Sequence, residues 1–165
     1  MELYLFRHGI AVDRSLGMPD SERPLTPKGE RKTRLVAQHL WQMDLSFEAI
    51  ATSPYLRAKQ TADILYSEKL GDRPITLPEL KPDGSFQAGV KWLKTWQKKY
   101  STKTCLILVG HQPNLGHWAE QLLWGKIGDR LILKKAGLIG IHLDSLEKAI
   151  PNHELFLLTS PKWML

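Results

Sequence analysis

LYLFRHG (residues 3–9) and LILVGHQPN (residues 106–114) are the two stretches that decide the fold of this chain. In each, an apolar run typical of a β-strand is followed by a histidine, His8 in the first and His111 in the second. In open parallel sheets, ligands bind beyond the carboxyl ends of the strands. We therefore expect Arg7, His8 and His111 to meet at one edge of a sheet, where they could hold a phosphoryl group.

The rest of the chain alternates between strand and helix patterns. Thr26-Pro27 and Ser53-Pro54 each combine a capping residue with a proline that suits the first turn of a helix. The apolar spacing predicts strands at about 2–7, 47–52, 75–77, 104–109, 137–143 and 154–159, and helices at about 27–43, 54–69, 86–96 and 113–123.

This alternation predicts an α/β fold, a three-layer α/β/α sandwich around a mostly parallel central sheet. The last two strands are too close in sequence for a helical crossover, so we expect an antiparallel edge. The run at 104–109 is almost purely apolar, which is typical of a central strand buried on both faces.

Composition limits the class of protein. A chain of 165 residues, 42% hydrophobic and 24% charged, suits one globular domain over residues 1–165. No run approaches the roughly 20 apolar residues needed to span a bilayer, and the first residues do not resemble a signal peptide, so we expect a cytoplasmic protein. Cys105 is the single cysteine and lies in an apolar run, where we expect a buried structural thiol.

The net charge of +6 is open to two interpretations. Lysines dispersed along helical segments are typical of a solvated basic surface, but they could also attract an anionic substrate or an acidic partner protein. No aromatic–basic RNA motif and no zinc-ligand spacing is present, so we expect no nucleic-acid partner. His39, His117 and His142 form no metal-binding pattern, and we expect neither a metal nor another cofactor.

Two further residues have positions that suit phosphate binding. Gly9 follows His8, and it lets the backbone turn sharply and bring its amides close to an anion. Arg57 lies in the first turn of the helix that follows the second expected strand. A cation there is unfavourable for the helix unless an anion binds, so Arg57 is placed for a ligand.

Taken together, these motifs resemble the histidine phosphatase superfamily, and within it the SixA-type phosphohistidine phosphatases. The motifs that carry the resemblance span nearly the whole chain: RHG (7–9), RPLTPKG (23–29), SPYLRAKQT (53–61), LPELKPDG (77–84) and GHQPNL (110–115). Each is common alone, but the set in this order is specific. The resemblance implies a phosphoglycerate mutase-like sandwich.

The resemblance also implies the roles of the site residues. His8 would be the phosphorylated nucleophile, and Arg7, Arg57 and His111 would form the phosphate pocket, in which a phosphate or sulfate ion should bind. His111 would add a cation if it is protonated. We expect substrate contacts from Arg7, Gly9, Arg57, His111 and Gln112. The one candidate for a general acid is Glu79, for which an ordinary loop carboxylate is an equally open interpretation.

The chain departs from the larger relatives in one respect. Ile10-Ala11 stands where many of them carry an acidic or amide residue, and 165 residues leave little room for a helical cap over the site. Because of this departure, the resemblance gives less reason to expect the sugar-phosphate or mutase activity of those relatives in this chain. It is compatible with an open site that admits a phosphate carried by a protein.

The sequence therefore predicts a monomeric phosphatase that removes phosphate from phosphohistidine in a signalling protein, through a covalent intermediate on His8. A histidine with a pKa near 6.5 is readily unprotonated at neutral pH, and imidazole is an easier leaving group than an alkoxide. Three alternatives stay open: a phosphatase of small metabolites, a phosphate-binding module without turnover and, last, a basic nucleic-acid binder.

Overall fold

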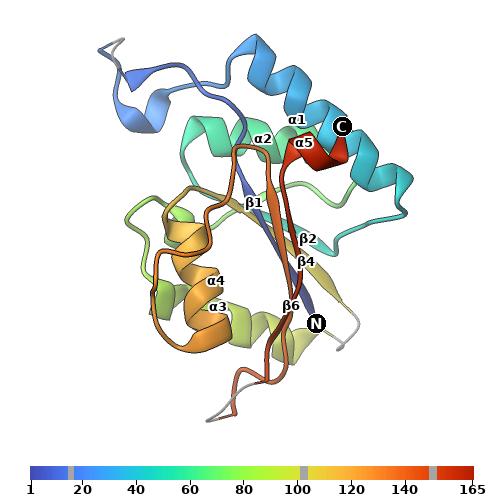
Figure 1. Cartoon of the computed structure of the whole chain (residues 1–165), viewed down its shortest axis with the longest axis vertical. Coiled ribbons are helices and arrows are strands. Elements are labelled where there is room, and N and C mark those ends of the chain that lie inside the picture. The colour runs from blue at the N-terminus through green and yellow to red at the C-terminus, as the bar shows by residue number, and fades with distance from the viewer. Residues whose placement is uncertain (15–16, 101–103, 149–151) are drawn as a thin grey trace.

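The computed structural model describes residues 1–14, 17–100, 104–148 and 152–165, and its centre is a six-stranded sheet (Figure 1). The order of the strands across the sheet is β3-β2-β4-β1-β5-β6. The strands are β1 (Glu2–Arg7), β2 (Ala49–Thr52), β3 (Ile75–Thr76), β4 (Cys105–Gly110), β5 (Leu138–His142) and β6 (Glu154–Thr159).

Pairing in the sheet is mixed, as the sequence predicts. β1, β2, β3 and β4 run parallel to one another, whereas β5 is antiparallel to both β1 and β6. β4 lies between β2 and β1, which confirms its central position. Arg7 is the register partner of Gly110, so His8 and His111 leave adjacent strands at the same level.

Helices cover both faces of this sheet and give the three layers of the expected sandwich (Figure 1). On one face lie α1 (Pro27–Gln42), α2 (Leu56–Ser67) and α5 (Pro161–Met164), and on the other α3 (Phe86–Lys99) and α4 (Asn114–Trp124). Short 3-10 turns, η2 (Asp20–Glu22) and η3 (Pro78–Leu80), lie in the loops.

Buried hydrophobic side chains form two clusters, one on each face of the sheet, and β1 contributes to both. Leu3 and Leu5 are buried in one cluster with Leu93 and Trp118, and Tyr4 and Phe6 in the other with residues of α1 and α2. Since successive side chains of a strand point to opposite faces, one short apolar run fills both layers. This leaves only the ends of the strands for polar chemistry.

Several element boundaries differ from the sequence prediction. β2 begins at Ala49, because Phe47 forms only an isolated bridge to Gly71. α2 begins at Leu56, after Ser53-Pro54, and α4 at Asn114, after a cis bond between Gln112 and Pro113. The helix α5 was not predicted at all. By contrast, Thr26 caps α1 as expected, with its hydroxyl accepting from the Gly29 N–H at 3.0 Å.

Cys105 corrects another expectation, because it is only partly buried. Its Sγ lies 3.5 Å from Glu2 Oε2. Desolvation and the Glu2 carboxylate raise the pKa of the thiol to about 11. Cys105 is therefore an unreactive thiol at the start of β4. Among the described residues, no helix is long and apolar enough to cross a bilayer.

Candidate active site

A cavity of about 250 Å³ lies at the carboxyl ends of β1, β2 and β4. It brings together Arg7, His8, Arg57 and His111, four residues that the sequence places in one site. The described residues that line it are Arg7, His8, Ala11, Arg14, Arg23, Arg57, Pro82, His111, Gln112 and Lys135.

The contacts of His8 distinguish its two ring nitrogens. The side chain is 6% exposed, and its Nδ1 lies 2.7 Å from the carbonyl oxygen of Gly9. A proton on Nδ1 satisfies that carbonyl and leaves a lone pair on Nε2, which accepts from Arg57 Nε at 3.2 Å. Burial, followed by the proximity of His111, lowers the pKa of His8 well below 6.5. His8 is therefore neutral at physiological pH.

Arg57 links His8 to an acidic residue, Asp20. Its side chain is only 2% exposed, and besides His8 it contacts Asp20 twice. Nη2 lies 3.0 Å from Asp20 Oδ2, and Nη1 donates to the Asp20 carbonyl. The Tyr55 ring lies beneath the guanidinium at 5.0 Å. A buried, always charged fork is suited to bidentate binding of a phosphoryl group.

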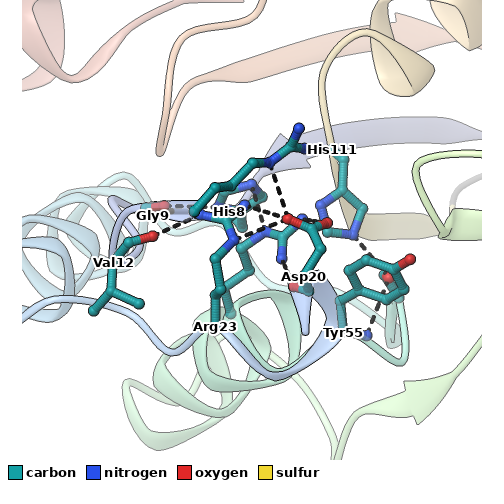
Figure 2. A network of polar contacts seen from close by, with 10 residues as sticks. His8, Gly9, Val12, Asp20, Arg23, Tyr55 and His111 are labelled. Atoms are coloured by element: carbon teal, nitrogen blue, oxygen red, sulfur yellow. Dashed lines mark hydrogen bonds and ion pairs between the residues drawn. The ribbon is translucent and has the colours of Figure 1, made fainter. Parts of the chain in front are cut away.

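Asp20 is the one carboxylate in a cluster of arginines, as the network in Figure 2 shows. Its oxygens lie 3.1 Å from Arg14, 2.7 Å from Arg23 and 3.0 Å from Arg57. Partial burial alone would raise its pKa, but the hydrogen bonds from Arg23 and Arg57 lower it to about 2. Asp20 is thus a resident anion that engages the donors a phosphoryl group would need.

Sequence reasoning missed three members of this network, Arg14, Asp20 and Arg23. Arg23 does lie within one of the motifs that carry the family resemblance, and this was a usable signal. Asp20 and Arg14 lie in the loop 10–26, where composition alone marks no residue as functional. The structure shows that Asp20 forms ion pairs with Arg14, with Arg23 and, from a distant part of the chain, with Arg57.

His111 lies against His8 but is not the cation that the sequence suggested. The two ring centroids are 5.1 Å apart, and His111 Nε2 lies 2.8 Å from the Ser53 hydroxyl. Burial, with a further contribution from Arg57, lowers the pKa of His111 to about 3. The ring is therefore neutral in the unliganded site. Its Nδ1 is buried without a hydrogen-bond partner in the described structure, so it could contact a bound phosphoryl group.

Arg7 and Gln112 are held by one loop that precedes β5. Arg7 Nη1 donates to the carbonyl oxygen of Leu133 at 2.8 Å. The Gln112 amide donates to the Leu131 carbonyl at 3.2 Å and accepts from the Leu133 N–H at 3.3 Å. Gln112 lines the cavity. Its hydrogen bond to Leu133 also holds the residue whose carbonyl oxygen orients Arg7.

Gly9 does not have the role that the sequence suggested. Its N–H donates to the Thr61 hydroxyl at 3.1 Å and is not directed at the cavity. The glycine is needed for packing, because a Cβ at this position would lie 2.4 Å from Thr33 Oγ1. This close approach seats the segment after His8 directly on α1.

Glu79 is not brought into the cavity. It lies in η3, and only Pro82 of the loop 78–84 lines the cavity wall. One carboxylate oxygen, Oε2, is buried without a hydrogen-bond partner among the residues described. Its proposed role as an acid therefore requires a movement of this loop when substrate binds.

The charges around the cavity favour an anion. Four arginines and Lys135 line it, and in the described structure the carboxylates of Asp20 and Asp13 interact with these cations. Within the described ranges, no group of three or more histidine, cysteine or acidic residues could hold a metal ion. The arrangement offers a neutral nucleophile and fixed positive charge, the two requirements of phosphoryl transfer to an enzyme side chain.

Comparisons with known proteins show the family of this chain. The sequence model of the histidine phosphatase superfamily (branch 1) matches residues 3–82. The phosphohistidine phosphatase SixA of Escherichia coli (strain K12) is 30% identical over 133 residues, which cover 76% of each chain. An uncharacterized protein of Picosynechococcus sp. (strain PCC 7002) is 53% identical over 166 residues, covering 100% of this chain and 99% of the relative.

Solved structures give the same result. The protein histidine phosphatase SixA complexed with tungstate matches with a TM-score of 0.86 and 26% identity, over 100% of both chains. The α-ribazole phosphatase of Shigella flexneri matches with a TM-score of 0.73 and 18% identity, over 98% of this chain and 97% of that one. The second likeness concerns the fold alone.

Proposed function

Because this chain belongs to the histidine phosphatase superfamily and is a phosphatase of the SixA type, we propose that its substrate is phosphohistidine in a protein. One observation supports the proposal above all others. The buried, neutral His8 holds its Nε2 lone pair within 3.2 Å of Arg57, at the wall of a cavity lined by arginines. A module that only binds phosphate would need the arginines but not this nucleophile.

In the first step, the Arg57 Nε–H turns from His8 Nε2 to an oxygen of the bound phosphoryl group, and the freed Nε2 lone pair attacks phosphorus. A bond forms between Nε2 and phosphorus, and the bond from phosphorus to the substrate imidazole nitrogen breaks. The electron pair of that bond leaves with the imidazole, which takes a proton from solvent. Arg7, Arg57 and Arg23 neutralise the phosphoryl oxygens during the transfer, which is catalysed mainly by positioning and positive charge.

In the second step, water attacks phosphorus of the phosphorylated His8. The new oxygen–phosphorus bond forms as the Nε2–phosphorus bond breaks, and the water proton is released as inorganic phosphate leaves. The Gly9 carbonyl accepts from Nδ1 throughout and keeps the ring in one tautomer. We propose that the enzyme acts as a cytoplasmic monomer, with which the free thiol of Cys105 is compatible.

The nature of the leaving group supports a nitrogen-linked phosphate. In the described part of the unliganded site, Asp20 has a pKa of about 2 and both histidines are neutral, so none of these three groups can act as a general acid near pH 7. An alkoxide leaving group needs a good acid, whereas an imidazole does not. The competing function is a phosphatase of small metabolites, which the fold shared with α-ribazole phosphatase keeps open.

The test is a comparison of kcat/KM for a phosphohistidine protein with a series of phosphomonoesters of increasing leaving-group basicity. We expect kcat/KM to fall steeply from phosphohistidine and nitrophenyl phosphate to alkyl phosphates. Efficient hydrolysis of a sugar phosphate, with no turnover of phosphohistidine, would contradict the proposal and favour the metabolite phosphatase.

Glu79 offers a second arm of this experiment. If Glu79 acts as an acid after the loop moves, Glu79→Gln should reduce kcat/KM for alkyl phosphates by about a hundredfold and affect phosphohistidine little. An equal effect on both substrates would assign Glu79 a structural role. Glu68→Gln, at a half-buried glutamate that follows α2 and pairs with Arg34, is the matched control.

A further inference from the structure

A second groove, of about 500 Å³, adjoins the active-site cavity. Arg7 and Lys135 line both of them, so the groove and the cavity lie on the two sides of one shared wall. Beyond the shared wall the groove is lined by three more lysines, Lys32, Lys134 and Lys162. We call it the lysine groove.

The three lysines come from distant parts of the chain. Lys32 lies on α1, Lys134 in the segment before β5, and Lys162 on α5, which packs against α1 (Figure 1). No carboxylate contributes to the described wall of the groove. The fold thus gathers like charges beside a site that is itself positive, and such an arrangement is stabilised when an anion lies between them.

We propose that the lysine groove binds an acidic segment of the phosphoprotein substrate, next to its phosphohistidine. The inference rests on the proposed function and narrows it to one class of protein. When a phosphohistidine side chain enters the cavity toward His8, the residues beside it must lie over the adjoining surface. Because Arg7 also lines the groove, the substrate residues that flank the phosphohistidine are the part of the substrate nearest to the groove.

The kind of charge in the groove favours carboxylates over a second phosphoryl group. The catalytic cavity uses arginines, whose planar forks match phosphate oxygens in pairs. The lysine groove instead offers single charges on flexible stems. Dispersed, mobile ammonium groups suit glutamate and aspartate side chains at several positions of a peptide.

The experiment uses two synthetic peptides, each with one phosphohistidine, flanked by glutamates in the first and by glutamines in the second. For each enzyme, the measurement is the ratio of kcat/KM for the acidic peptide to kcat/KM for the neutral one. We expect a ratio of about ten for the wild type at low salt, the sum of several partly exposed ion pairs, and a fall toward one at high salt.

The lysine-groove variant is Lys32→Glu/Lys134→Glu/Lys162→Glu, with Lys135 left intact because it lines the catalytic cavity. Its ratio should fall to one or below. The matched control, Lys91→Glu/Lys99→Glu/Lys126→Glu, changes the net charge equally on and beside the helices of the opposite layer and should retain the wild-type ratio. A ratio near one in the wild type, or an equal loss in both variants, would overturn the inference.

A second assay separates failure of this inference from failure of the proposed function. The unphosphorylated acidic peptide should inhibit hydrolysis of nitrophenyl phosphate by the wild type, and the lysine-groove variant should need about tenfold more peptide. If no phosphohistidine peptide is turned over, the proposed function fails. The inhibition assay still tests whether the lysine groove binds an acidic peptide, because it does not require turnover of phosphohistidine. Equal inhibition of both enzymes by the peptide, or stronger inhibition by a single-stranded oligonucleotide, would overturn the assignment to an acidic peptide.

Discussion

His8 Nε2 has one hydrogen-bond partner in the described structure, the Nε–H of Arg57, which also contacts Asp20. At the scale of the residue, these three groups define the unliganded site. A bound phosphoryl group must take over the arginine donors that Asp20 now engages. In the proposed mechanism, phosphate binding therefore depends on the planar Arg57 guanidinium and on the charge of Asp20.

Arg57→Lys should lower kcat/KM for nitrophenyl phosphate by about a hundredfold or more, because an ammonium group cannot donate along two directions of a planar fork. Steady-state kinetics measures the loss. Arg34→Lys, at an exposed arginine paired with Glu68, is the control and should behave like the wild type. Near-normal kinetics of Arg57→Lys would contradict the assignment of Arg57 as a phosphate-binding residue.

Asp20→Asn should make inorganic phosphate a better inhibitor, with its inhibition constant reduced by roughly fivefold. The reason is that the carboxylate competes with phosphate for Arg23 and Arg57. Asp63→Asn, on the exposed face of α2, serves as the control. Weaker inhibition by phosphate in Asp20→Asn would show that Asp20 instead prepares the arginines for the ligand.

The acid limb of the pH profile should lie well below pH 6.5. His8 attacks only when neutral, and burial lowers its pKa, so it stays unprotonated as the pH falls from 7 through 6. The measurement is kcat/KM for nitrophenyl phosphate against pH, after correction for the ionisation of the substrate. A limb at or above pH 6.5 assigned to His8 would contradict the geometry of its contacts.

At the scale of the element, one buried carboxylate organises the loop that holds Arg7. Glu120 of α4 is fully buried and accepts hydrogen bonds from the backbone N–H groups of residues 128–131, at 2.9 Å from Asp129 and 2.8 Å from Leu131. These hydrogen bonds lower its pKa to about 2 although burial opposes them. Two residues further on, the Leu133 carbonyl accepts from Arg7.

Glu120→Gln should lower the free energy of unfolding by about 2–3 kcal/mol, because an amide offers only one oxygen to four N–H donors. Urea unfolding measures this difference, with Glu147→Gln at an exposed ion pair as the control. Since the folded-state pKa is lowered, the stabilisation is complete above the unfolded value of 4.5 and is lost as the pH falls toward 2. A difference that stays constant through this range would contradict the role of the charge.

Much of the element level could be predicted from the sequence. The apolar runs identified β1 and β4, and the Thr26-Pro27 pair marked the start of α1. The predicted start of α2 was wrong, because the Ser53 hydroxyl accepts from the Tyr55 N–H at 3.3 Å, before the helix begins, and also lies 2.8 Å from His111 Nε2. A capping pattern in the sequence does not show whether the side chain also contacts a residue far away in the chain.

At the scale of the whole molecule, the mixed sheet determines what the sequence could and could not reveal. The adjacency of His8 and His111 followed from two strands that end in the same register, a rule of parallel sheets. Asp20 and the lysine groove could not be predicted in this way. They depend on contacts between segments far apart in the chain, such as Asp20 with Arg57 or α1 with α5.

Trapping of the phosphoenzyme with substrate labelled in its phosphoryl group shows directly which residue carries the phosphoryl group. We predict that the label appears on His8 of the wild type, in a linkage that acid breaks and base does not. His8→Ala should acquire no label and turn over no substrate while keeping the circular dichroism spectrum of the folded protein. Label on a serine, an aspartate or another histidine of the wild type, or turnover by His8→Ala, would contradict the account.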